Sequence, residues 1–233
     1  MPKKERIRNL FNNIAPKYDQ LNRLMSFGTD KLWRRKAVRE ITETGLPISV
    51  LDVASGTADF AIDIARQLSP KSHIIGIDIS EQMLEKGRKK IAEAHLDTSI
   101  SLQLADAENL PFNDDEFDYV TVAFGVRNFE NLTQGLVEMH RVLRANGKLI
   151  ILELSYPDSP IILWIYKIYA LHFIPFLCGL ISGNKEAYQY LPLSILQFPK
   201  PAKFVPMLQE IGFNKISVKN MTLGVCRMYL CEK

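Results

Sequence analysis

The sequence predicts an α/β fold built on a seven-stranded, mostly parallel sheet with helices on both faces. From Ser49 onward, short apolar segments alternate with helical patterns, and strand-helix alternation of this kind forms a parallel sheet. The last two β-rich segments, Phe213 to Met221 and Val225 to Cys231, are joined only by a turn around Thr222-Leu223-Gly224. A link this short requires antiparallel pairing, so one strand runs against the others.

The predicted elements follow one another with short connections. The other five strands are expected at Ile48 to Val53, His73 to Asp78, Ser99 to Leu104, Tyr119 to Phe124 and Lys148 to Leu154. Helices are expected near Ala58 to Leu68, Glu81 to Ala94, Leu132 to Leu143 and Lys203 to Ile211. Asn146-Gly147 is expected to end the third of these helices, and Gly212 the fourth.

Two segments fall outside this alternation. We expect a helical arm over residues 1–45 and a helical insertion over 157–201, which flank a core at 46–156 and a closing helix and strands at 202–233. The insertion contains the apolar run Ile161 to Ile181, interrupted by Lys167, His172 and Pro175. A charge within a bilayer costs about 2.5 to 3.5 kcal/mol, so we expect a buried or interfacial helix broken near Pro175 rather than a membrane span.

Composition indicates one globular domain without metals or disulfides. The chain has 233 residues, 47% of them hydrophobic, and Lys plus Arg exceed Asp plus Glu by 29 to 26. This small excess does not indicate nucleic acid as the main partner. It is concentrated at the N-terminus (Lys3, Lys4, Arg6, Arg8) and around Trp33 (Lys31, Arg34, Arg35, Lys36, Arg39), where it fits a solvated helix face, a membrane surface or an acidic ligand. The three cysteines are odd in number and form no C-x-x-C pair.

The segment after the first strand, Val53-Ala54-Ser55-Gly56-Thr57-Ala58, resembles the entrance to a nucleotide site but has a single glycine. Dinucleotide loops need three glycines so that the pyrophosphate can approach the backbone, and a P-loop needs Gly-Lys-Ser/Thr. Both patterns fail here. The loop can still direct backbone N–H groups at a ligand that has no phosphate.

Acidic residues near the ends of the next two strands favour an adenosine ligand. Asp78 ends the second strand, 22 residues after Gly56, where its carboxylate can accept both ribose hydroxyls or serve the following helix as a cap. After the third strand, Asp106 can accept a hydrogen bond from an exocyclic amine, and Ala107 leaves room for a flat ring. The alternative for these two residues is a polar turn before Pro111. The exit of the fourth strand carries Arg127-Asn128, where a second substrate would meet the ligand.

Together these elements resemble a class I, Rossmann-like S-adenosylmethionine-dependent methyltransferase, and more narrowly the ubiquinone/menaquinone biosynthesis C-methyltransferase (UbiE-type) family. The narrower likeness rests on Tyr18-Asp19-Gln20-Leu21-Asn22, Ser26-Phe27-Gly28, Trp33-Arg34-Arg35, Phe124-Gly125-Val126-Arg127-Asn128, Tyr190-Leu191-Pro192-Leu193-Ser194-Ile195 and Phe198-Pro199. It covers nearly the whole chain in the correct order.

The resemblance implies a set of site residues. S-adenosylmethionine would be bound by Asp52, Gly56, Thr57, Asp78, Asp106, Ala107 and Ala123, and the catalytic residues would be Tyr18, Asp19, Arg127 and Asn128, with no metal. The sequence departs from the family at Ser55-Gly56-Thr57-Ala58, commonly Gly-Gly-Thr-Gly, and at Ala123, where some members have Ser. These changes bear on cofactor affinity, since one lost hydroxyl contact is worth about 0.5 to 1.5 kcal/mol.

The resemblance also implies the reaction, C-methylation of a prenylated quinol. Demethylmenaquinol is the expected acceptor, with a 2-polyprenyl-6-methoxy-benzoquinol or another small molecule as the alternatives. A quinol carbon becomes nucleophilic when the neighbouring phenol loses its proton, near pH 10 in water. We expect Arg127 to stabilise the oxyanion with Asn128, or to order a water that takes the proton. His140 and His172 lie outside the matched loops, so we expect structural roles for them.

A polyprenyl tail keeps the acceptor in the membrane, since each buried CH₂ contributes about 0.8 kcal/mol. We therefore expect a cytoplasmic protein that contacts the inner face of the cell membrane. The side chains expected to line a prenyl channel or to lie at the bilayer interface are Trp164, Tyr166, Tyr169, Phe173 and Phe176. A plain lid and a homodimer interface are the alternatives for this segment.

Other activities fit the sequence less well. The Asp/Asn-Pro-Pro-aromatic motif of nucleic-acid amine methylation is missing after the fourth strand, and that loop has no cysteine for cytosine C5 chemistry. The glycine count disfavours a nicotinamide oxidoreductase. A binding module without activity is the non-enzyme alternative, and Asp78, Asp106, Arg127 and Asn128 argue against it.

Overall fold

The computed structural model describes residues 3–42, 46–169 and 185–233, with the side chains of 185–189 excepted. Seven strands form one sheet in the order β3-β2-β1-β4-β5-β7-β6. Their bounds are β1 Ser49–Val53, β2 His73–Asp78, β3 Ile100–Leu104, β4 Phe117–Ala123, β5 Leu143–Leu154, β6 Asn214–Met221 and β7 Cys226–Glu232. All pairs are parallel except those of β7, which runs antiparallel to both β5 and β6. The predicted sheet is confirmed.

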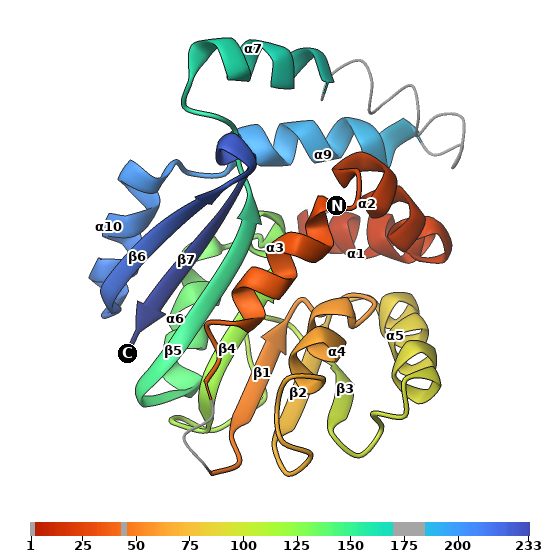
Figure 1. The fold of residues 1–233 in the computed structure, drawn as a ribbon, viewed down its shortest axis with the longest axis vertical. Coiled ribbons are helices and arrows are strands. Elements are labelled where there is room, and N and C mark those ends of the chain that lie inside the picture. The colour runs from red at the N-terminus through yellow and green to blue at the C-terminus, as the bar shows by residue number, and fades with distance from the viewer. Residues whose placement is uncertain (1–2, 43–45, 170–184) are drawn as a thin grey trace.

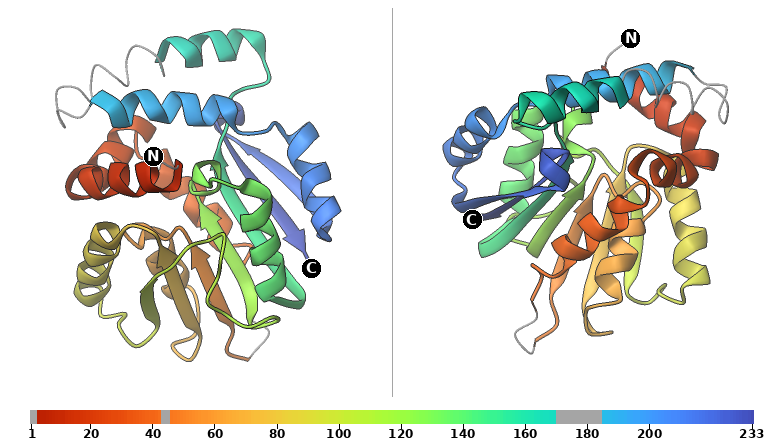
Figure 2. Two further views of the ribbon diagram at one scale, coloured as in Figure 1. Left: turned by 180° about the vertical axis from the view of Figure 1, so that it is seen from behind. Right: turned by 45° about the horizontal axis from the view of Figure 1, so that its top comes forward.

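Helices cover both faces of this sheet and its carboxyl edge (Figures 1 and 2). α3 (Thr29–Val38), α4 (Asp59–Ala65) and α5 (Glu81–Glu93) lie on one face, and α6 (Leu132–Val142) and α10 (Pro201–Ile211) on the other. α1 (Lys3–Ile14), η1 (Ala15–Lys17), α2 (Tyr18–Ser26), α7 (Pro160–Ile168) and α9 (Lys185–Gln197) lie above the carboxyl ends of the strands. The described residues also include two further short 3-10 turns, η2 (Val126–Asn128) and η4 (Thr222–Gly224).

Two hydrophobic clusters hold these layers together. One is centred on β4, β5, α6 and α10 and includes Val120, Leu136, Phe204 and Tyr229; the other lies under α3 and α4. The apolar positions of β1 are fully buried on both faces, as expected for a central parallel strand. α5 begins at Ser80, whose hydroxyl accepts the Met83 N–H, and α10 ends at Gly212 with φ 118°, as predicted.

One predicted boundary is wrong. Asn146-Gly147 does not end α6, which stops at Val142, because the chain enters β5 directly at Leu143. Leu143 pairs with Phe117 and Lys148 with Tyr119, so residues 144–147 form an irregularity within the strand. Asn146 adopts φ 63° there, and its N–H donates to the Lys233 carbonyl. The Asn-Gly signal was genuine, but it marks a bulge rather than a helix end.

Candidate active site

A buried carboxylate, that of Asp52, supports the loop after β1 by accepting hydrogen bonds. Asp52, 1% exposed, accepts hydrogen bonds from the hydroxyls of Ser55 at 2.6 Å and Thr121 at 2.8 Å. Burial raises its pKa to about 6, although both hydroxyls act in the opposite direction. Ala54, Gly56 and Ala58 all adopt left-handed conformations, which are unfavourable for the two alanines.

Asp78 joins this loop to the end of β2. One carboxylate oxygen accepts the Gly56 N–H at 2.9 Å and the other accepts the Ser80 N–H at 2.9 Å. Burial raises the pKa of Asp78 to about 6, and the backbone donors only partly offset this effect. Since Ser80 caps α5, Asp78 is not needed as the cap. Each of its oxygens keeps a lone pair that can accept a further donor from a ligand.

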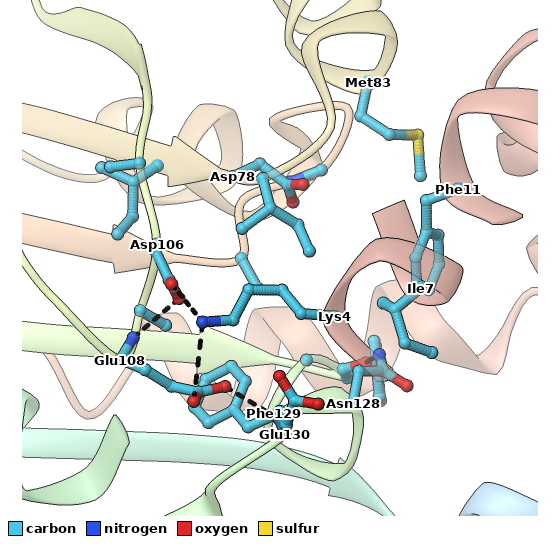
Figure 3. Close-up of a pocket in the computed structure, with 18 of the residues that line it drawn as sticks. Lys4, Ile7, Phe11, Asp78, Met83, Asp106, Glu108, Asn128, Phe129 and Glu130 are labelled. Atoms are coloured by element: carbon cyan, nitrogen blue, oxygen red, sulfur yellow. Dashed lines mark hydrogen bonds and ion pairs between the residues drawn. The ribbon is translucent and has the colours of Figure 1, made fainter. Parts of the chain in front are cut away.

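A cavity opens above Gly56 and Asp78 (Figure 3). Its wall combines the carboxyl ends of β1, β2 and β4 with the loop after β3 and the inner side of α1 and α2. The lining residues are Lys4, Ile7, Phe11, Tyr18, Ala54, Gly56, Ile77, Asp78, Ile79, Met83, Ala105, Asp106, Ala107, Glu108, Ala123, Phe124, Gly125, Asn128, Phe129 and Glu130. We call it the nucleoside cavity.

Five of the seven predicted cofactor residues line the nucleoside cavity: Gly56, Asp78, Asp106, Ala107 and Ala123. Of the four predicted catalytic residues, Tyr18 and Asn128 also line it. The wall is close-packed where two loops meet, since a Cβ on Gly125 would lie 2.5 Å from that of Ala54.

Thr57 and Asp19, by contrast, line neither this cavity nor the next. The buried Thr57 hydroxyl donates to Asp19 at 2.7 Å, and the Asp19 carboxylate pairs with Lys86 at 3.0 Å and Lys90 at 3.4 Å. Burial alone would raise the pKa of Asp19, but the hydrogen bond from Thr57 and the two lysines lower it below its usual value. This Asp19 cluster (Asp19, Thr57, Lys86 and Lys90) joins α2 to the loop after β1 and to α5. Its geometry fits positioning rather than contact with a reacting atom.

The arm brings basic side chains to the mouth of the nucleoside cavity. Lys4 Nζ lies 2.5 Å from Asp106 and 3.8 Å from Glu108 (Figure 3). Lys3 donates to the Phe129 carbonyl. The hydrogen bond to Asp106 raises the pKa of Lys4. The basic N-terminus is therefore not simply a solvated face. Around Trp33, likewise, Arg34 is buried and paired with Asp30 and Asp63.

A second cavity adjoins the first, with a volume of about 1040 Å³ against about 670 Å³. The two share Phe11, Tyr18 and Phe124 as a common wall. Its lining is mainly aliphatic and aromatic: Leu10, Phe11, Ile14, Tyr18, Leu21, Asn22, Met25, Ser26, Asp30, Trp33, Arg34, Phe124, Arg127, Leu154, Tyr166, Tyr169, Tyr190, Leu191, Ile195 and Val225. We call it the acceptor cavity.

Arg127 lies in the wall of the acceptor cavity with its side chain only 6% exposed. Its Nη1 donates to Glu153 at 2.6 Å and to the Phe124 carbonyl, and its Nε–H is buried without a partner in the described structure. An unsatisfied buried donor is costly, which marks this nitrogen as one that a ligand can satisfy. Desolvation lowers the pKa of Arg127, but the charge and hydrogen bond of Glu153 together with the neighbouring Tyr18 and Tyr190 raise it above its usual value.

Asn128 connects the two cavities. Its Oδ1 accepts the hydroxyl of Tyr190 at 3.0 Å, and its Nδ2 donates to the Phe124 carbonyl at 3.4 Å. Phe124 itself has φ 60°, an uncommon conformation for a bulky residue, and its ring packs 6.0 Å from that of Trp33. Strained backbone is thus held at the boundary between the cavities.

Sequence reasoning missed several residues of this site. Ile7 and Phe11 of α1 line the nucleoside cavity, yet nothing in the arm's helical pattern distinguishes them from packing residues. Lys4, which also lines it, was noted only as part of the basic N-terminus. Glu153 could have been found, since it is a lone acid in the apolar run Leu149-Ile150-Ile151-Leu152-Glu153-Leu154 and is fully buried. His140, as expected, has a packing role: its ring lies 4.8 Å from that of Phe213. His172 falls outside the described residues.

Comparison with solved structures supports the fold. A SAM-dependent methyltransferase from Thermotoga maritima matches with a TM-score of 0.67, at 18% identity, over 97% of this chain and 99% of that one. A putative S-adenosyl-L-methionine-dependent methyltransferase from Methanococcus maripaludis matches with a TM-score of 0.65, at 19% identity, over 95% and 93%. At these identities the likeness establishes the architecture alone, and the expected Rossmann-like methyltransferase fold is confirmed.

Sequence relatives are much closer. The Ubiquinone/menaquinone biosynthesis C-methyltransferase UbiE of Geobacter sulfurreducens is 46% identical over 233 residues, 99% of this chain and 90% of that protein. The Demethylmenaquinone methyltransferase of Bacteroides fragilis is 42% identical over 231 residues, 99% and 94%. The profile of the ubiE/COQ5 methyltransferase family matches residues 1–233. The chain therefore belongs to the ubiE/COQ5 methyltransferase family.

Proposed function

We propose that this enzyme transfers a methyl group from S-adenosylmethionine to a ring carbon of a prenylated quinol, with demethylmenaquinol as the acceptor. The observation that carries the proposal is the acceptor cavity: a large apolar chamber beside the nucleoside cavity, with Arg127 and four tyrosines in its wall. An apolar chamber with a few convergent polar groups suits a hydrophobic molecule bearing one ionisable head. The names of the two relatives support this substrate class, since one is a demethylmenaquinone methyltransferase and the other a ubiquinone/menaquinone biosynthesis C-methyltransferase.

The nucleoside cavity fits the methyl donor. Asp78 has free acceptor capacity for ribose hydroxyls, Asp106 for the adenine amine, and Ala107 and Ile79 offer apolar surface to a flat ring. The loop after β1 has a single glycine and no Gly-Lys-Ser/Thr, in agreement with a donor that carries no phosphate. When bound, S-adenosylmethionine supplies an electrophilic methyl group on a sulfonium centre.

The protein's part in the chemistry is to orient the quinol and to stabilise its phenolate. The unpartnered Arg127 Nε–H can donate to the developing oxyanion, which would satisfy a donor that is otherwise buried and unpaired. Tyr18 lies in the wall common to both cavities, and Asn128, fixed by Tyr190, lies beside it. Orientation of this kind can contribute about 7 to 11 kcal/mol.

Neither cavity is lined by a histidine among the described residues. Tyr18, Tyr166 and Tyr190 are the ionisable hydroxyls nearest Arg127, and burial raises the pKa of each, to about 12 for Tyr166. They remain protonated at neutral pH and act as donors. A water ordered near Arg127 is therefore the proposed acceptor of the phenol proton.

We further propose that α7 meets the membrane. Tyr166 and Tyr169 face the acceptor cavity, while Ile161, Trp164 and Ile165 are 74%, 66% and 56% exposed. One short segment thus joins the cavity to an outward apolar surface, the arrangement needed to receive a lipid-embedded substrate. No described helix is long and apolar enough to cross a bilayer. Phe173 and Phe176, also predicted to act here, lie outside the described residues.

Side-by-side assays test the proposed reaction. Purified enzyme with labelled S-adenosylmethionine should methylate reduced demethylmenaquinone faster than a 6-methoxy-benzoquinol, and should leave the oxidised naphthoquinone unmethylated, since the quinone lacks a nucleophilic carbon. Arg127→Ala should lower turnover far more than cofactor affinity. Methylation of the oxidised form, or an active Arg127→Ala enzyme, would contradict the mechanism. Preference for the benzoquinol would reassign the acceptor.

A further inference from the structure

Glu153 makes the closest charged contact of Arg127, yet it lines neither cavity. One carboxylate oxygen accepts Arg127 Nη1 at 2.6 Å and the Leu154 N–H at 2.8 Å, and the other accepts the Arg127 backbone N–H at 3.1 Å. With 0% side-chain exposure, the carboxylate is fully engaged behind the arginine. It cannot touch the substrate, so any role in the reaction acts through Arg127.

We infer that Glu153 is a positioning residue that also sets the pH at which the acceptor phenol ionises, because it offsets the positive charge of Arg127. This inference rests on the proposed phenolate chemistry. A lone buried guanidinium would favour a neighbouring phenolate strongly, and an opposite charge at this range moves a pKa by about 1 to 3 units. Paired with Glu153, Arg127 acts chiefly as a fixed hydrogen-bond donor.

Other charged side chains lie near this pair. Arg227, opposite Glu153 in the register of β5 and β7, is itself paired with Asp158 at 2.7 Å, and Arg6 acts on Tyr190. Tyr18, Tyr166 and Tyr190 face Arg127, and Cys226 and Tyr229 face Glu153; burial raises the pKa of all five, so they are neutral near pH 7. The other charged residues lining the acceptor cavity, Asp30 and Arg34, are bonded to each other at 2.8 Å. Asp78 lies across the shared wall, near Tyr18.

The arrangement has a functional consequence. An uncompensated arginine would hold the phenolate firmly from low pH onward, and the same attraction would reduce the reactivity of the ring carbon. Pairing with Glu153 instead keeps the Arg127 guanidinium in place and weakens its electrostatic attraction for the phenolate. Removing the negative charge of Glu153 and removing the positive charge of Arg127 should therefore shift the pKa of a bound phenol in opposite directions.

The test titrates a bound phenol directly, without methyl transfer. A 4-nitrophenol carrying a short isoprenoid tail is bound to the enzyme with S-adenosylhomocysteine present, and its phenolate absorbance is followed against pH. Glu153→Gln should lower the pKa of the bound phenol by about 1 unit or more relative to the unmodified enzyme, and Arg127→Gln should raise it. Glu153→Asp, which keeps the charge, should stay close to the unmodified value.

Glu153→Gln removes half of a buried ion pair and can fail to fold, so the double variant Arg127→Gln/Glu153→Gln provides the second comparison. It should give a lower phenol pKa than Arg127→Gln alone. The acid limb of the methylation rate against pH should move in the same directions. The inference would be overturned if the bound phenol had the same pKa in Glu153→Gln as in the unmodified enzyme, or the same pKa in the double variant as in Arg127→Gln. Failure of the phenol to bind would also overturn it. Absence of quinol methylation by the unmodified enzyme would instead refute the proposed function.

Discussion

Three aspartates near the carboxyl ends of adjacent strands have different roles. Asp52 is buried under the loop and bonded to Ser55 and Thr121. Asp78 faces the nucleoside cavity and fixes the Gly56 N–H. Asp106 lies at the cavity mouth, paired with Lys4. Sequence position grouped them as cofactor residues, but burial distinguishes the one that supports the loop from the two that can reach a ligand.

Replacing Asp78 by Ala should weaken S-adenosylhomocysteine binding by about 1.5 to 3 kcal/mol, since a charged acceptor for two hydroxyls is lost. Titration calorimetry measures the change directly. Asp97→Ala, at an exposed position outside both cavities, is the matched control and should bind as the unmodified protein does. Equal affinity for the two variants would refute the ribose role of Asp78.

Asp52 makes stability depend on pH. Its pKa in the folded protein, about 6, lies above the ordinary value of 3.8. The contribution of Asp52 to the free energy of unfolding is therefore fully present below pH 3.8 and is lost as the pH rises through 6. Asp52→Asn keeps the shape and removes the buried charge. Its free energy of unfolding should equal that of the unmodified protein near pH 4 and exceed it by about 2 to 3 kcal/mol at pH 7.5.

Urea denaturation at several pH values measures this difference. Thr121→Val supplies a comparison, because it removes a hydrogen bond that the Asp52 carboxylate accepts and should destabilise the protein most at pH 7.5, where the charge is present. A constant difference between Asp52→Asn and the unmodified protein across pH would show that Asp52 does not titrate near 6.

At the scale of elements, the arm is attached by charged side chains as well as by packing. The Asp19 cluster ties α2 to the loop after β1 and to α5, while Lys3 and Lys4 tie α1 to the loops after β3 and β4. Leu10 and Leu21 form a small hydrophobic cluster of their own, whereas α3 packs into a main core cluster. The charged contacts of α1 and α2 can therefore be changed without disturbing the core.

Asp19→Asn should loosen α2. The variant keeps the acceptor for Thr57 but loses attraction to Lys86 and Lys90, worth about 1 kcal/mol for partly exposed pairs. Backbone hydrogen exchange within Tyr18–Ser26 should speed up about fivefold, read by mass spectrometry. Glu85→Gln, an exposed change on α5, should leave it unaltered. Unchanged exchange in Asp19→Asn would mean that packing alone holds the arm.

Regular elements were predictable because their signals are local. Apolar runs gave the strands, the short Thr222-Leu223-Gly224 link gave the antiparallel β7, and Gly212 gave the end of α10. Asn146-Gly147 was misplaced because the same dipeptide serves helix ends and strand irregularities, and only pairing with Phe117 and Tyr119 decides between them. The Glu153–Arg127 pair joins positions 26 residues apart, and no local pattern encodes that contact.

At the scale of the whole molecule, the nucleoside cavity and the acceptor cavity both lie at one edge of the sheet. The carboxyl ends of the strands form its floor, and α1, α2, α7 and α9 cover it (Figure 1). Arg227, 1% exposed, anchors the insertion to the sheet through Ser155 and Asp158, each at 2.7 Å. The covering layer is thus fixed at its base, with α7 outermost.

Membrane contact through α7 can be measured by flotation with vesicles containing an anionic phospholipid. Trp164→Ser combined with Ile165→Ser should reduce the bound fraction at least about tenfold, since two large exposed apolar side chains are lost from the interface. Val137→Ser, on α6 at the face of the sheet, is the control and should float normally. Equal flotation of both variants would exclude α7 as the contact and favour a lid or a dimer interface.

The common wall of Phe11, Tyr18 and Phe124 bears on inhibitor design. Only one layer of side chains separates the two cavities, so an adenosine analogue and a naphthol joined by a short linker could occupy both at once. For such a bisubstrate compound to bind, only side chains of this shared aromatic wall would have to change conformation. Its selectivity over other Rossmann-like methyltransferases would come from the naphthol half, because the acceptor chamber is enclosed by the arm and the insertion rather than by the shared sheet.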